Sequence, residues 1–110
     1  MADIPWADEF PGAIIITDLT GKIIYLNRQA ARQEGGDELL GQQLEDCHSE
    51  KSRQKIKEIM ESKKPNVYTI EKLGQKKLIY QTVWTKKGEV AGLLELSLPI
   101  PFELPHFVRD

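Results

Sequence analysis

Apolar residues of this chain fall into short strand-like runs on either side of a helical middle. Residues 13–17 and 22–26 are rich in isoleucine, and Asp18 and Gly21 lie in the polar segment between them, which predicts a β-hairpin. Because the isoleucines are consecutive rather than alternating, they point to both faces of the strands. We therefore expect something to cover each side of the sheet.

The middle of the chain predicts helices. Asn27 is suited to cap a short helix that ends at the two glycines 35 and 36, and residues 37–40 can form a single helical turn at most. The longest helix is expected from about Ser49 to Lys63. Its inward stripe consists of Ser52, Ile56, Ile59 and Met60.

The remaining chain predicts three more strands. In the last of them the three leucines at 94, 96 and 98 alternate with Glu95 and Ser97, so we expect the leucines to face a core and the polar pair to face away. This order of elements predicts an α+β domain with one antiparallel sheet and helices packed on one face. The expected strands are residues 67–72, 76–86 and 89–98.

The two ends of the chain differ from its centre. In residues 1–10, four apolar side chains are spaced to form one side of a short amphipathic helix, which we expect to cover the sheet. Residues 99–110 contain three prolines, which exclude a continuous helix and predict an extended tail. The domain proper is expected at residues 11–98.

Composition narrows the class of protein. A chain of 110 residues has the size of one domain, and a formal net charge of −2 offers nothing to attract nucleic acid or an anionic bilayer. No apolar run is long enough to span a membrane. The single cysteine excludes an internal disulfide, so we expect a soluble cytoplasmic protein.

Several segments together resemble the PAS domain family. The hairpin at residues 17–27, Ala30, the DELLG run at 37–41 and the glycine-led strand at 88–95 carry the resemblance, which spans residues 11–98. It implies a five-stranded antiparallel sheet in the spatial order 2-1-5-4-3, with helices forming one wall of a cavity. Such domains bind small ligands or cofactors, pair with one another and pass on signals. We expect a sensory module of this kind and no enzyme, because no nucleophile and base are paired in the sequence.

Cys47 and His48 are the best candidates for site chemistry, and they resemble a PAS sub-group with a Cys-His pair before the long helix. If the helix already includes His48, this side chain shares the inward stripe with Ile56 and can ligate a haem iron. If the helix begins later, His48 only bonds a backbone carbonyl. No other metal site is expected, and flavin is disfavoured because flavin-binding relatives have asparagine, cysteine and arginine in sequence here.

Cys47 itself has two interpretations. A thiol near a helix N-terminus ionises more readily, which favours oxidation, although most lone cysteines are simply buried.

The same patterns predict two surfaces. We expect His48 to be the polar anchor of a ligand cavity and a homodimer to form through the N-terminal segment and the outer sheet face, for contact with a signalling partner. The alternative is a ligand-free dimerisation or interaction module with a filled core. The predicted cavity residues are Cys47, His48, Ser52, Ile56, Ile59, Met60, Tyr80, Leu94 and Leu96, and the predicted interface residues are Trp6, Phe10, Ile15 and Leu93.

Overall fold

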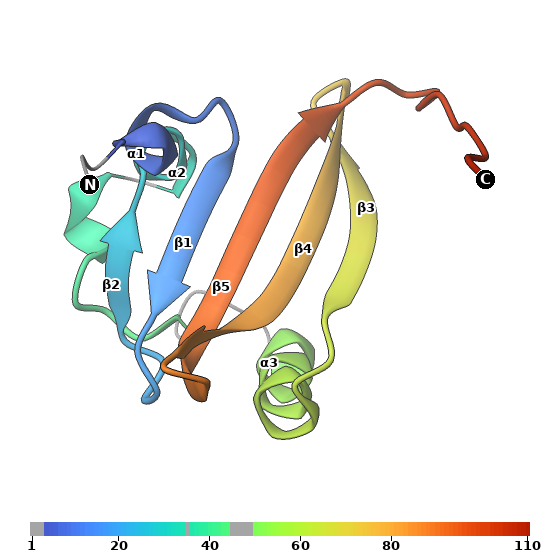
Figure 1. Cartoon of the computed structure of the whole chain (residues 1–110). Coiled ribbons are helices and arrows are strands. Elements are labelled where there is room, and N and C mark those ends of the chain that lie inside the picture. The colour runs from blue at the N-terminus through green and yellow to red at the C-terminus, as the bar shows by residue number, and fades with distance from the viewer. Residues whose placement is uncertain (1–3, 35, 45–49) are drawn as a thin grey trace.

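In the computed structural model, the chain forms one antiparallel sheet of five strands flanked by helices (Figure 1). The structure describes residues 4–34, 36–44 and 50–110. The strand order is β2-β1-β5-β4-β3, so the predicted order is confirmed. In chain order the elements are α1 (Trp6–Glu9), β1 (Ala13–Thr17), β2 (Ile23–Leu26), α2 (Arg28–Glu34), the 3₁₀ helix η1 (Asp37–Leu39), α3 (Glu50–Ser62), β3 (Asn66–Lys72), β4 (Gln75–Lys86) and β5 (Glu89–Ile100).

The two faces of the sheet are covered by different elements. On the inner face, the helical segments pack on a core that includes Ala13, Ile15 and Leu93 from the sheet and Ile59 from α3. On the outer face, α1 lies beside Ile16 of β1 and Tyr25 of β2. The consecutive isoleucines of β1 thus point to both covered faces, as predicted.

Strand β5 continues two residues beyond its predicted end, through Pro99. A proline lacks the N–H that a ladder needs, so it is tolerated where a strand has a neighbour on one side only. The β1 ladder ends at the pair Ala13 and Ser97, whereas β4 continues alongside to the pair Lys76 and Ile100. The tail therefore begins at residue 101, where it leaves the body of the domain with all ten residues to 110 exposed (Figure 1).

Asn27 joins four segments through its side-chain amide. Its Oδ1 accepts from the N–H of Ala30 at 2.9 Å, which confirms the predicted cap of α2, and from the N–H of Ile14 at 3.0 Å. Its Nδ2 donates to the carbonyls of Ala7 at 2.9 Å and Gly12 at 2.8 Å. One fully buried side chain therefore ties α1 and β1 to the start of α2.

The turn between β1 and β2 is organised by Asp18. Its Oδ1 accepts from the Thr20 hydroxyl at 2.7 Å, from the Thr20 N–H at 2.9 Å and from the Lys22 N–H at 3.0 Å. The hydrogen bond from the Thr20 hydroxyl is the main reason why the pKa of Asp18 lies below its ordinary value of 3.8.

This shift predicts a pH-dependent contribution to stability. Because the folded pKa is depressed, the ionised carboxylate stabilises the fold above pH 3.8, and this contribution is lost as the pH falls through the folded pKa. The unfolding free energies of the native protein and Asp18→Asn, measured by urea denaturation from pH 7 to pH 2.5, should converge at the acid end. A difference that stayed constant over this range would contradict the assignment.

Candidate functional site

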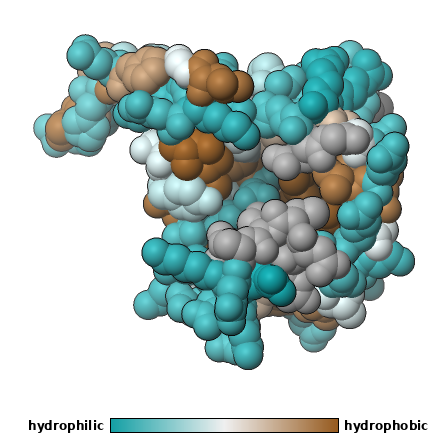
Figure 2. Space-filling view, turned by 180° about the vertical axis from the view of Figure 1, so that it is seen from behind, coloured by the Kyte–Doolittle hydropathy of each residue, from teal (hydrophilic) through white to brown (hydrophobic). Residues whose placement is uncertain are grey.

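The inner face of the sheet contains a cavity of about 220 Å³, here called the sheet cavity. Figure 2 shows this side of the molecule, where apolar residues are visible in a recess bordered by hydrophilic ones. The apolar side chains come from strands β1 to β4, from η1 and from Leu44, while the polar ones come from α2, β3, β4 and β5. The cavity is lined by Ala13, Ile15, Ile23, Gln33, Leu39, Leu44, Tyr68, Ile70, Lys72, Lys77, Ile79, Glu95 and Ser97.

One row of paired polar residues crosses the sheet and ends at Glu95, which lines this cavity. Asn66, Gln81 and Glu95 are direct neighbours on β3, β4 and β5. The Asn66 amide nitrogen donates to the Gln81 oxygen at 2.9 Å, and the Gln81 nitrogen donates to a Glu95 carboxylate oxygen at 2.7 Å. Gln81 is only 4% exposed, so this polar row, as we call it, crosses the buried centre of the sheet.

Tyr68 lies on β3 at the side of the same cavity. Burial raises the pKa of its hydroxyl, and the negative charge of Glu95 raises that pKa further. Glu95 and Tyr68 thus line the cavity from β5 and β3, the two strands that flank β4, and a ligand between them would lie near the Glu95 charge.

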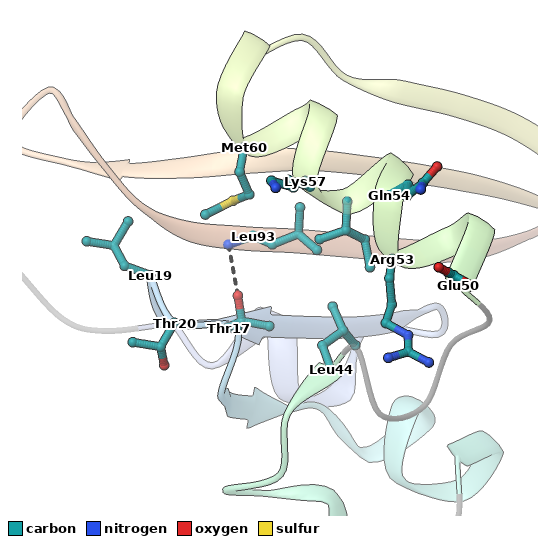
Figure 3. Close-up of a pocket in the computed structure, with 12 residues that line it drawn as sticks. Thr17, Leu19, Thr20, Leu44, Glu50, Arg53, Gln54, Lys57, Met60 and Leu93 are labelled. Carbon is teal, nitrogen blue, oxygen red and sulfur yellow. Dashed lines mark hydrogen bonds between the residues drawn. The ribbon is translucent and has the colours of Figure 1, made fainter.

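A second recess, of about 280 Å³, lies between α3 and the β1–β2 turn, and we call it the α3 pocket. Figure 3 shows Met60 of α3 above Leu93 of β5, with Leu19 of the turn to one side and Leu44 below. Arg53 and Lys57 also line this pocket. Leu44 lines both the α3 pocket and the sheet cavity, so the two recesses adjoin.

The prediction about the faces of β5 was wrong. Glu95 and Ser97 line the sheet cavity, so Leu94, Leu96 and Leu98 point to the outer face. Tyr80 pairs with Leu96 on the neighbouring strand and shares that face. Tyr80, Leu94 and Leu96 therefore do not line the cavity. Alternation shows which residues share a face but not which face is inward, and here the apolar set is the outward one.

The two interface residues predicted within the sheet were placed on the wrong side for the same reason. Ile15 is 7% exposed and Leu93 is 2% exposed, and both belong to the core under the helices. Trp6, by contrast, is 63% exposed on α1, and its ring packs edge-on against Phe10. Phe10 is partly buried, and the interface role of these two aromatic residues stays a prediction.

The residues predicted from the long helix divide into two groups. Ile56 and Met60 line the α3 pocket, whereas Ile59 is buried in the core. Cys47 and His48 lie outside the described residues, as does the side chain of Ser52. Within the described segments, no three side chains of the metal-ligating types cluster closely enough to hold an ion.

Sequence reasoning missed the polar row. It assigned Glu95 to the solvent and gave Gln81 no role. The available signal was the position of Gln81 in the middle of an otherwise apolar long strand, since an amide in a central strand needs a partner on the same face.

Comparison with known proteins shows the family to which this chain belongs. A PAS domain family model matches residues 11–92. The chain belongs to the PAS domain family. Among curated proteins, none matches the chain in sequence. None of the helices in the described part of this PAS domain is long and apolar enough to cross a bilayer.

Solved structures share the PAS fold at low sequence identity. A C-terminal domain from Streptococcus mutans is 18% identical, with a TM-score of 0.68 over 84% of this chain and 78% of that one. A sensory box sensor histidine kinase from Vibrio cholerae is 10% identical, with a TM-score of 0.67 over 86% of each chain. The Aer2 receptor of Vibrio cholerae, described as a dual PAS-heme oxygen sensor, is 16% identical, with a TM-score of 0.60 over 82% of this chain and 95% of that one.

Proposed function

We propose that this PAS domain is a sensory signalling module that binds a small ligand in the sheet cavity, rather than a catalyst. The observation that carries the proposal is the end of the polar row, where the Glu95 carboxylate lines the cavity beside apolar side chains and accepts a hydrogen bond from the buried Gln81 amide. A few convergent polar groups in an apolar cavity are typical of a ligand site. A domain that only dimerised would gain more stability from apolar side chains at these positions.

The size of the cavity limits the ligand. Sites for drug-sized molecules usually measure about 300–1,000 Å³, and the sheet cavity measures about 220 Å³. A haem macrocycle is larger than such molecules and does not fit the cavity formed by the described residues. The described cavity therefore gives the haem hypothesis no support, and the hypothesis rests on His48 alone. If haem is bound, His48→Ala should abolish its visible absorption.

The outer face of the sheet supports the proposed homodimer. Beyond the area beside α1, strands β4 and β5 present partly buried leucines with no described element over them. Uncovered apolar faces of this kind mark interaction surfaces. The proposed interface, which we call the leucine face, consists of Leu78, Tyr80, Leu94, Leu96 and Leu98, with Trp6 and Phe10 at its edge.

Strand β5 offers a physical route for the signal. Glu95 points into the sheet cavity, while its neighbours Leu94 and Leu96 belong to the leucine face. A ligand that pulls on Glu95 thus acts on the strand that carries the interface. If the dimer can adopt two arrangements, a ligand that binds one of them more tightly shifts the population toward that arrangement. A partner protein would then recognise the favoured arrangement.

Native mass spectrometry of the freshly purified protein, together with its absorption spectrum, tests the sensor function. We expect a mass above that of two bare chains, with the excess lost on denaturation. A colourless protein with the mass of two bare chains would instead favour the ligand-free dimerisation module.

Replacing Leu96 with aspartate should convert the dimer to a monomer, because the charge would lie at the centre of the leucine face. Leu73→Asp is the matched control, since Leu73 is 97% exposed in the β3–β4 turn and does not belong to that face. Light scattering after size exclusion gives the masses. A dimer that survived Leu96→Asp would exclude the leucine face as the interface.

A further inference from the structure

The hydrogen bonds of the polar row have a fixed direction. An ionised carboxylate can only accept hydrogen bonds, so the NH₂ group of Gln81 must face Glu95, and its oxygen must face Asn66. The observed bonds have this arrangement, with Asn66 donating to Gln81 and Gln81 donating to Glu95. The row therefore ends at the Glu95 carboxylate, whose oxygens can accept further hydrogen bonds.

In the part of the chain that the structure describes, Glu95 forms no ion pair, since no lysine or arginine there lies within ion-pair distance of it. Lys72 and Lys77 also line the cavity, but both lie toward the β3–β4 turn, and the Cα atom of Lys77 is about 14 Å from that of Gln81, four residues along β4. The part of the cavity beside Glu95 thus has hydrogen-bond-accepting and negative character, while both lysines lie toward the other end.

Apolar side chains adjoin the carboxylate on both neighbouring strands. Ile15 is its direct neighbour on β1, and Ile79 lies one inward position along β4 from Gln81. A partly buried charge in such surroundings interacts strongly with a donor that reaches it, because little water competes. A neutral donor would complete the row, and a cationic donor would also balance its charge.

We propose that the sheet cavity selects a small ligand with a cationic nitrogen donor, such as a protonated amine, which bonds to Glu95 while its apolar part packs on Ile15 and Ile79. This inference rests on the proposed ligand-binding function and names the class of ligand. A carboxylate or phosphate bonded to this end of the cavity is disfavoured, since it would place like charge against Glu95 while Lys72 and Lys77 lie toward the other end.

Three probes that share one ring test the class of ligand: benzylamine, which is protonated at neutral pH, benzyl alcohol and benzoate. Titrations followed by ¹H–¹⁵N NMR report both affinity and location. We expect benzylamine to bind at least about tenfold more tightly than benzoate, the ratio typical of one charge-assisted hydrogen bond, with shifts at the amides of Tyr68, Gln81 and Glu95. Equal or tighter binding of benzoate, or no binding of any probe, would overturn the inference.

Matched variants separate the role of Glu95 from general charge effects. Glu95→Gln keeps an acceptor for Gln81 and should remove the preference for benzylamine. Glu89→Gln removes an equal charge from an exposed position at the start of the same strand and should leave the preference intact. Equal effects of the two variants would show that net charge, not the cavity, sets the preference.

The pKa of Tyr68, measured without any ligand, tests whether the Glu95 charge lies near the cavity. Glu95→Gln should lower the pKa of Tyr68, because part of the elevation of that pKa comes from the Glu95 charge. The pKa is measured by NMR of ¹³C-labelled tyrosine. An unchanged pKa would mean that Glu95 does not face the cavity as an ionised group.

Failure of this inference differs from failure of the sensor function. A co-purified molecule that is anionic, or that has no nitrogen donor, would support the sensor function and reject the ligand class. Bare chains that bind none of the probes would reject both.

Discussion

Replacing Asn27 with alanine is expected to lower the free energy of unfolding by about 4 kcal/mol or more. Five backbone groups would lose a hydrogen bond: the N–H groups of Ile14 and Ala30 and the carbonyls of Ala7, Phe10 and Gly12. Loss of the helix cap costs about 1 kcal/mol, and each buried group left unsatisfied costs about 1–3 kcal/mol. The melting temperature should fall by more than about 15 °C, since each kcal/mol corresponds to about 4–8 °C in a domain of this size.

Two further variants make the Asn27 prediction specific. Asn27→Ser keeps an acceptor for the N–H of Ala30 but loses the amide donors, so its stability should lie between those of the native protein and the alanine variant. Gln29→Ala on the same helix should change stability by less than about 0.5 kcal/mol. Urea denaturation followed by circular dichroism gives the three values. If Asn27→Ala behaved like Gln29→Ala, the proposed role of the Asn27 hydrogen bonds would be wrong.

Replacing Gly92 with alanine is expected to cost about 3 kcal/mol or more. Gly92 lies on β5 opposite Trp84, where the β4–β5 register shifts, and its φ is +156°. A methyl group there would overlap the carbonyl oxygen of Thr17 and lie 2.7 Å from Trp84 Nε1. The Trp84 indole donates to that carbonyl at 2.8 Å, so the clash would also break this bond between β4 and β1.

Gly88 provides the control for this prediction. It also has a positive φ, +82°, but a methyl group there would meet nothing within 4 Å. Gly88→Ala should therefore cost only about 1–2 kcal/mol, the strain of a left-handed alanine. Denaturation followed by tryptophan fluorescence measures both variants. Similar costs for the two would show that the close approach of β5 to Thr17 does not matter for stability.

The predicted variants divide the molecule into a stability centre and a functional centre. Asn27 and Gly92 bring segments together at the ends of β1, and neither residue lines the sheet cavity. Substitutions of Glu95 and Leu96 are expected to change ligand preference and dimerisation instead. These two neighbouring residues connect the cavity and the interface through one strand.

Much of the fold was predictable because its signals are local. The turn residues Asp18 and Gly21, the cap at Asn27 and the long polar helix each depend on interactions within a few residues. Their order along the chain was enough for the resemblance, and the resemblance implied the correct sheet order. Sequence reasoning also recognised that the isoleucines of β1 face two covered sides.

The candidate site was much less predictable. The alternation in β5 separates Leu94 and Leu96 from Glu95, but it has the same period whichever set is inward. Only the pairing of β5 with β1 and β4 shows that Glu95 continues a row with Gln81 and Ile15. Prediction had assigned the leucines to the cavity and the carboxylate to the solvent.

The sequence by itself determined the identity and order of the elements, since backbone propensities, caps and turns act between near neighbours. The tertiary structure alone decided which face of each strand points inward, because that choice depends on contacts between residues far apart in the chain. The same contacts place Asn66, Gln81 and Glu95 in one row and Asn27 between four segments. The fold was thus determined by local signals, and the chemistry of the cavity by long-range pairing.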